Sequence, residues 1–243
     1  MNTSVSDNNQ YPLVCQAAAT DDNIFATFKN NSKYTDILEH VSYDDGREYI
    51  NKFINNNNII NNIDKFKIND IHGSPKTYKY NIGTFSPTTL RYLSVLNDIS
   101  QLPLDGIDIV EIGAGYGGQY SVLRQLYTPR KYIFVDLPEV LNLIKKYITK
   151  LNLDDIDIEY YDLKNIKQIN SDLLISNYAF SECNESIQDI YIDKLINHSN
   201  HGYMIYNNMH GYKHNTFIEL CAKKVKVFNE VPNTDPRNVL LTW

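Results

Sequence analysis

The segment with the clearest chemical meaning is a glycine-rich turn, Val110-Glu-Ile-Gly-Ala-Gly-Tyr-Gly-Gly118, at the end of a β-branched run. Glycine adopts positive φ angles readily, and its missing side chain lets a ligand approach the backbone closely. Gly113, Gly115 and Gly118 have the G-x-G-x-x-G spacing of dinucleotide-binding turns. This spacing predicts a nucleoside site at a strand–helix turn, but it does not say which nucleoside.

Three carboxylates accompany the turn. Asp136 lies 21 residues after Gly115 and ends the next predicted strand, where it can accept hydrogen bonds from both ribose hydroxyls. Glu111 lies inside a strand end, where a buried carboxylate needs a cationic or hydrogen-bonding partner. A ligand ammonium would supply one, whereas a pyrophosphate would be repelled. Asp162, after a third strand, either accepts from an adenine amino group or caps a helix.

Polar residues also gather where the fourth and fifth apolar runs stop, at 176–182 and 207–210. Glu182 and His210 are the candidate general bases there. A histidine near its usual pKa of about 6.5 accepts a proton at neutral pH, whereas Glu182 needs burial to raise its pKa. Two alternatives stay open: a helix-dipole role for Glu182 and an ordinary loop position for His210. Tyr178 either lines the ligand or packs.

Arg91 belongs to a helix that we predict to start at Ser86-Pro87, since serine caps helices and proline suits the first turn. Its guanidinium can clamp a carboxylate or a phosphate, or form a surface ion pair. His210 and His214 have the i, i+4 spacing of metal ligands, but no third ligand joins them, so we expect no metal.

The elements that must position these residues alternate after residue 106, which predicts βαβ units and a parallel sheet. The expected strands are Ile107–Ile112, Tyr132–Val135, Ile156–Tyr161, Leu173–Ser176 and Gly202–Tyr206, and the helices are Gln119–Tyr127, Pro138–Leu151, Glu185–His198 and Lys213–Lys223. Two last runs, Lys224–Val231 and Asn238–Trp243, are joined by a loop too short for a helix, so they must be antiparallel. The predicted fold class is α/β: a Rossmann-like, seven-stranded, mostly parallel sheet with a C-terminal antiparallel β-hairpin.

Residues 1–80 are predicted to form an N-terminal helical cap on a domain of residues 81–243. The first dozen residues are polar, and we expect them to be disordered. Short apolar-periodic pieces between Asn and Asp predict short helices from about residue 24 to 71. The Asn55–Asn58 tract should be a loop or a poorly helical stretch.

The length and composition of the chain limit the classes of function that we expect for this protein. The 243 residues suit one large domain with a small appended piece. A formal net charge of −6 argues against nucleic-acid binding. Three widely spaced cysteines without a CxxC pair argue against a disulfide framework or a thiolate metal site. Neither a signal peptide nor an 18-residue apolar run occurs, so we expect a cytoplasmic protein without membrane contact.

Four motifs carry a resemblance to a known family: Ser86-Pro-Thr-Thr-Leu-Arg-Tyr92, Glu111-Ile-Gly-Ala-Gly-Tyr-Gly-Gly118, Asp136-Leu-Pro138 and Ser176-Asn-Tyr-Ala-Phe-Ser-Glu182. From about Gly83 to the C-terminus the chain resembles the class I S-adenosylmethionine-dependent methyltransferases. More narrowly, it is similar to the sugar O-methyltransferase family of carbohydrate and surface-polysaccharide gene clusters.

The resemblance implies a transferase of class EC 2.1.1 that uses S-adenosyl-L-methionine and a small sugar-type acceptor in polysaccharide biosynthesis. Its implied cofactor-binding residues are Glu111, Gly113, Gly115, Gly117, Asp136, Leu137, Asp162, Asn177 and Arg91, and its implied catalytic residues are Glu182, His210 and Tyr178.

Several alternatives stay open. The acceptor could be another small polar molecule, such as a phosphorylated amino alcohol, the chain could be a non-catalytic cofactor-binding module, or it could be an NAD-dependent enzyme. A nucleic-acid methyltransferase is disfavoured, because the Asn/Asp-Pro-Pro-aromatic motif of base methylation is absent at Ser176–Phe180. Whether the chain forms a homodimer is also open.

Overall fold

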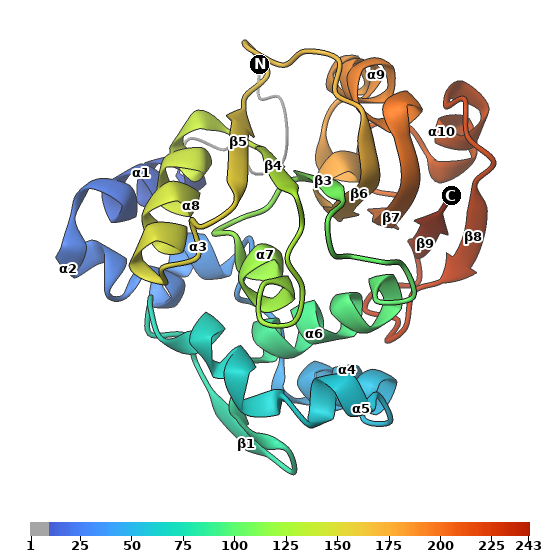
Figure 1. The fold of residues 1–243 in the computed structure, drawn as a ribbon. Helices are drawn as coiled ribbons and strands as arrows, with labels where there is room; N and C mark the ends of the chain where they lie inside the picture. Colours follow the sequence, from blue (N-terminus) through green and yellow to red (C-terminus); the bar gives the residue numbers. More distant parts are fainter. Residues whose placement is uncertain (1–9) are drawn as a thin grey trace.

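A seven-stranded mixed sheet is the centre of the computed structural model, which describes residues 10–243 (Figure 1). The strands are β3 (Asp108–Ile112), β4 (Lys131–Val135), β5 (Asp157–Tyr161), β6 (Ser171–Asn177), β7 (Ser199–Asn207), β8 (Lys226–Asn229) and β9 (Asn238–Thr242). Their order is β5-β4-β3-β6-β7-β9-β8. The first five are parallel, whereas β9 runs antiparallel to β7 and β8. The predicted α/β sheet with a C-terminal antiparallel hairpin is confirmed.

The sheet has a core on each face, because successive strand residues point to opposite sides. In β3, Ile109 joins a core with the N-terminal helices, whereas Val110 and Ile112 join a second core. The first core also holds residues of α6 (Pro87–Ile99), α7 (Gly118–Leu123) and α8 (Pro138–Lys150), and the second those of α9 (Glu185–Lys194) and α10 (His214–Leu220). The molecule is therefore layered helix–sheet–helix. Along the chain, strands are added outward from β3 on one side (β4, then β5) and from β6 on the other (β7). The direction of this order changes between β3 and β6, and ligands of α/β sheets bind at such a switch point.

The N-terminal segment consists of short helices and one hairpin. Its elements are α1 (Tyr11–Thr20), α2 (Asp22–Phe25), α3 (Ser32–Thr35), α4 (Tyr43–Phe53), α5 (Asn57–Ile60), 3₁₀ turns at Phe28–Asn30 and Ile63–Asp70, β1 (Tyr78–Tyr80) and β2 (Gly83–Phe85). The helices are short because polar side chains cap them repeatedly, as Asp21, Asn31 and Asn56 do. Helix α1 lies against α8 and α4 against α6 (Figure 1), so this segment covers the first core.

The structure corrects several predicted boundaries. The prediction of disorder to about residue 12 is wrong for Tyr11 and Pro12, which are buried in the first turn of α1. Gln10 precedes this helix, and residues 1–9 lie outside the described part of the chain. The helix predicted at Gln119–Tyr127 ends at Leu123. The predicted cap at Ser86 is confirmed, since its side chain accepts from the Thr89 N–H. None of the helices within residues 10–243 is long and apolar enough to cross a bilayer.

Candidate functional site

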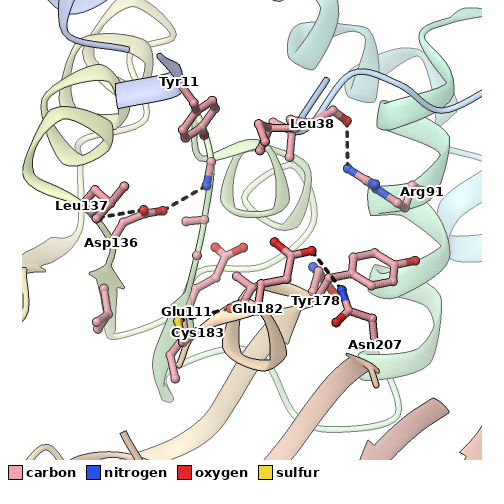
Figure 2. Close-up of a pocket in the computed structure, with 18 of the residues that line it drawn as sticks. Tyr11, Leu38, Arg91, Glu111, Asp136, Leu137, Tyr178, Glu182, Cys183 and Asn207 are labelled. Carbon is pink, nitrogen blue, oxygen red and sulfur yellow. Dashed lines mark hydrogen bonds between the residues drawn. The ribbon is translucent and has the colours of Figure 1, made fainter. Parts of the chain in front are cut away.

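A cavity of about 690 Å³ lies at the carboxyl ends of the five parallel strands (Figure 2). This volume is within the usual range of ligand pockets. We call the part formed by the turns after β3, β4 and β5 the glycine half. The tyrosine half is formed by the turns after β6 and β7, by residues 40–49 and by the loop 234–238. Five strands about 4.8 Å apart give the whole site room for an elongated ligand beside a second molecule.

The glycine turn brings bare backbone to the cavity wall. Gly113 has φ 73° and Gly115 has φ 60°, and both line the cavity. A Cβ atom on Gly113 would lie 1.9 Å from the Cβ of Ala179, and one on Gly115 would lie 2.9 Å from a methyl of Leu38. Gly117, which was also predicted to bind the cofactor, does not line the cavity. It turns the chain into α7 with φ 86°, and its free side faces Ile144.

Asp136 ties the tip of β4 to this turn. One carboxylate oxygen accepts from the Gly115 N–H at 3.3 Å and the other from the Leu137 N–H at 2.8 Å (Figure 2). Burial raises the pKa of Asp136 to about 7. No cation pairs with it among the described residues. A hydroxyl donor on a ligand would therefore compensate a poorly solvated carboxylate here.

Glu111 is 2 % exposed at the tip of β3. Its carboxylate accepts from the Tyr132 hydroxyl at 2.7 Å. Burial raises the pKa of Glu111 to about 8, and the neighbouring Asp136 contributes to this increase. The cationic partner that the sequence left open is therefore not supplied by the described residues, and the protein alone provides one neutral donor.

Asp162, Leu137 and Asn177, which were predicted to bind the cofactor, all line the cavity. One oxygen of Asp162 accepts from the backbone N–H groups of Lys164 and Asn165 at 2.9 and 3.1 Å. This is the capping alternative, although it closes a turn and no helix follows. The adenine contact predicted for Asp162 stays a prediction. Asn177 is more informative, because its Oδ1 is buried without a hydrogen-bond partner among residues 10–243.

Of the two candidate bases, only Glu182 reaches the cavity. It accepts from the side-chain amide of Asn207 at 2.9 Å (Figure 2), and burial raises its pKa. His210 is exposed and does not line the cavity, so the structure does not support its predicted role. The reason is local: β7 ends at Asn207, and the following turn carries His210 outward while Met209 lines the wall.

Tyr178 is held by a residue that the sequence analysis missed. Its hydroxyl donates to Glu230, which is 4 % exposed. Glu230 also accepts from the backbone N–H of Thr234 at 2.9 Å and from the side-chain amide of Asn238 at 3.0 Å. Thus one buried carboxylate fixes both the Tyr178 side chain and the loop that closes the tyrosine half. No sequence signal marks Glu230, since an acidic residue near the end of a predicted strand such as Lys224–Val231 is common on protein surfaces.

Arg91 points toward the cavity from α6 (Figure 2). It is 6 % exposed and donates to the carbonyl oxygen of Leu38 at 3.3 Å. Its Nε has no hydrogen-bond partner among residues 10–243, and no ion pair with a described carboxylate accompanies it. A buried guanidinium without an anion is costly. Among the described residues, therefore, no carboxylate forms an ion pair with Arg91, although Glu39 raises its pKa from a greater distance, and no cation pairs with Glu111.

Within residues 10–243, no group of three or more His, Cys, Asp or Glu side chains is arranged so that it could hold a metal ion. His214, one of the two histidines at helical spacing, instead lies 3.0 Å from the side chain of Asn208.

Comparisons with known proteins add information about the fold. No family model matches the chain, and no curated protein matches it in sequence. Among solved structures it is similar to a SAM-dependent methyltransferase from Aquifex aeolicus (15 % identity, TM-score 0.47, covering 62 % of this chain and 87 % of that one). It is also similar to the ribosomal protein L11 methylase from Lactobacillus delbrueckii (13 %, 0.46, 63 % and 77 %).

A third similar structure is the pyocyanin biosynthetic protein PhzM, at 10 % identity and a TM-score of 0.45. The match covers 63 % of this chain but only 56 % of that protein's length. All three likenesses are distant, at 15 % identity or less.

Proposed function

We propose that this protein is an S-adenosylmethionine-dependent O-methyltransferase that acts on a hydroxyl of a sugar or sugar derivative. The observation that carries the proposal is the complementary charge defect of the cavity. Among the described residues, no cation pairs with Glu111 or Asp136, and no carboxylate forms an ion pair with Arg91. S-adenosylmethionine carries an ammonium, a sulfonium, a ribose and a carboxylate, so it can satisfy all three residues.

The residues fit this cofactor individually. Glu111 and the unpartnered Oδ1 of Asn177 can accept from the ammonium. Asp136 can accept from the ribose hydroxyls, and the free Nε of Arg91 can donate to the carboxylate. A dinucleotide fits less well, because its pyrophosphate would lie near Glu111 and Asp136, and like charges in a partly desolvated site repel strongly.

The chain's own contribution to methyl transfer is mainly alignment. The bound donor supplies an activated methyl group, so placing the acceptor hydroxyl in line with it can provide roughly 7 to 11 kcal/mol of the barrier. Glu182 would accept the hydroxyl proton, since it lies in the tyrosine half and its pKa is raised. Asn207 orients the Glu182 carboxylate, and Tyr178 lines the acceptor.

Calorimetric titration with S-adenosylmethionine tests the cofactor, and transfer of a labelled methyl group to a panel of sugars tests the acceptor. We expect saturable donor binding and methylated sugar. Absence of donor binding by the folded protein would refute the proposal. Transfer only to phosphorylated amino alcohols would favour the alternative acceptor class, and donor binding without any transfer would indicate a non-catalytic module. Micromolar binding of NADH, followed by fluorescence, would favour a dehydrogenase.

A further inference from the structure

The charges in the tyrosine half restrict the acceptor further, given the proposed function. Asp45, Glu182 and Asp235 line this half, and Glu230 lies behind Tyr178. Asp235 is neutralised by Arg237, which donates to both of its oxygens at 2.7 and 2.6 Å. The remaining carboxylates have no such partner among the described residues.

The cations within reach do not balance them. His40 lines the same half, but burial and the nearby Arg91 lower its pKa, so its neutral form is favoured. Arg91 lies where the two halves meet, and its guanidinium carbon is 6.0 Å from the centre of the Tyr178 ring. Its guanidinium donates to the backbone carbonyl of Leu38 (Figure 2). A methyl group of Leu38 lies 2.9 Å from the position of a Cβ atom on Gly115. Under the proposed function the donor carboxylate neutralises Arg91, and among the described residues no other permanently charged cation lines the tyrosine half.

The groups that remain suit hydroxyls. One oxygen of Asp45 already accepts from the N–H and the hydroxyl of Ser42, and its other oxygen can accept from a ligand hydroxyl. The rings of Tyr49 and Tyr178 offer apolar faces for the C–H side of a sugar ring. A phosphate or carboxylate on the acceptor would instead meet unbalanced negative charge in a partly desolvated space.

We propose that the acceptor is an uncharged, hydroxyl-rich glycosyl group, and that nucleotide-linked and phosphorylated sugars are excluded. This inference rests on the proposed function, which supplies the anion for Arg91. The acceptor would then be methylated before activation or after transfer to a glycan, not while it carries a nucleotide.

The first experiment avoids turnover. The protein is saturated with S-adenosylhomocysteine, which retains the donor's carboxylate, and is titrated with inorganic phosphate in a calorimeter. We expect no saturable phosphate binding up to 10 mM, a concentration of about ten times a weak 1 mM affinity. Saturable binding anywhere within this range would overturn the inference. Failure of S-adenosylhomocysteine itself to bind would contradict the proposed function instead, so the two failures are distinguishable.

The second experiment compares matched acceptors at saturating donor: methyl glycosides, the same sugars as 1-phosphates, and their uridine-diphosphate forms. We expect kcat/KM for the uncharged forms to exceed that for the charged ones by about 100-fold. The variant Asp45→Asn should reduce this preference about tenfold. Asp44→Asn is the control, since Asp44 is an exposed neighbour that does not line the cavity. Equal or better use of a charged acceptor by the unaltered protein would overturn the inference.

Discussion

The glycine half of the cavity is formed by backbone turns directly after strands, whereas the tyrosine half is closed by side chains from distant segments. In the former, Asp136 binds the N–H of Gly115, so neighbouring strand tips hold each other. In the latter, Tyr178 depends on Glu230, which is 52 residues away in sequence. The glycine half therefore follows from the sheet itself, while the tyrosine half depends on how the termini fold over it.

The largest expected effect is on the glycine half. Gly115→Arg should abolish donor binding, because Gly115 has φ 60°, has Leu38 at 2.9 Å from the Cβ position, and faces the cavity. Calorimetry with S-adenosylmethionine measures this loss. The control is Gly106→Ala: Gly106 has φ 72°, but nothing lies within 4 Å of its Cβ position. It should share the backbone strain and keep donor binding. Donor affinity retained by Gly115→Arg would remove the turn from the site.

The next effect separates catalysis from donor binding. Glu182→Gln should lower kcat by about 10² to 10⁴, the usual contribution of a general base, while the donor Kd stays unchanged. His210→Gln is the matched comparison and should leave kcat unchanged, because His210 is exposed outside the cavity. Initial rates of labelled methyl transfer measure both variants. A loss confined to His210→Gln would restore the histidine as the base and remove Glu182.

The same contrast explains what the sequence could predict. The glycine turn, Glu111 and Asp136 were predictable because one βαβ unit places them by local rules of strand and turn. Glu230 and Asp45 were not, because only tertiary packing brings them to the cavity. His210 was assigned to the site because it follows a strand, but the direction of the turn after Asn207 depends on its contacts. The β1–β2 hairpin was missed since three-residue strands leave little periodicity.

Arg91 lies where the two halves of the cavity meet, and its substitution tests whether it binds the donor. Arg91→Gln should weaken S-adenosylmethionine binding about 10- to 100-fold, because a charge-assisted hydrogen bond contributes about 1.5 to 3 kcal/mol. Binding of decarboxylated S-adenosylmethionine should change little, since that compound lacks the group we assign to Arg91. Parallel calorimetric titrations measure both affinities. Equal losses for the two compounds would show that Arg91 supports the fold of the site and does not bind the carboxylate.

Glu111 at the tip of β3 and Asp136 at the tip of β4 predict that donor affinity depends on pH and that this dependence arises in the glycine half. The pKa of Glu111 is raised to about 8 and that of Asp136 to about 7, so both carry protons in the ligand-free protein at pH 6. Binding the cationic donor favours their ionised forms. Donor affinity should therefore rise by more than ~10-fold from pH 6.5 to pH 8, with proton release. Calorimetry in buffers of different ionisation enthalpy measures both, and affinity independent of pH would contradict the assignment.

The same two carboxyl groups should affect the stability of the ligand-free protein in the opposite direction: its free energy of unfolding should fall as pH rises. The folded-state pKa values of Glu111 and Asp136 lie above their unfolded values of 4.5 and 3.8. Their contribution to stability is therefore fully present below pH 3.8 and is lost progressively as pH rises toward 8. Chemical unfolding of the ligand-free protein should show this decline, and Glu111→Gln should flatten it. A decline of the same steepness in Glu111→Gln would assign it to other groups.

The smallest effect should appear in the tyrosine half. In the unaltered protein, the Tyr178 hydroxyl and the Thr234 N–H donate to the two carboxylate oxygens of Glu230. Glu230→Gln keeps one of these oxygens as an amide carbonyl and replaces the other with an N–H₂ group, which cannot accept. Either Tyr178 or the Thr234 loop therefore loses its acceptor. We expect the acceptor KM to rise about fivefold, which corresponds to about 1 kcal/mol, with the donor Kd unchanged. Glu219→Gln on the exposed face of α10 is the control. A fall in donor affinity as large as the rise in the acceptor KM would show that Glu230 stabilises the whole cavity. This result would contradict the independence of the two halves.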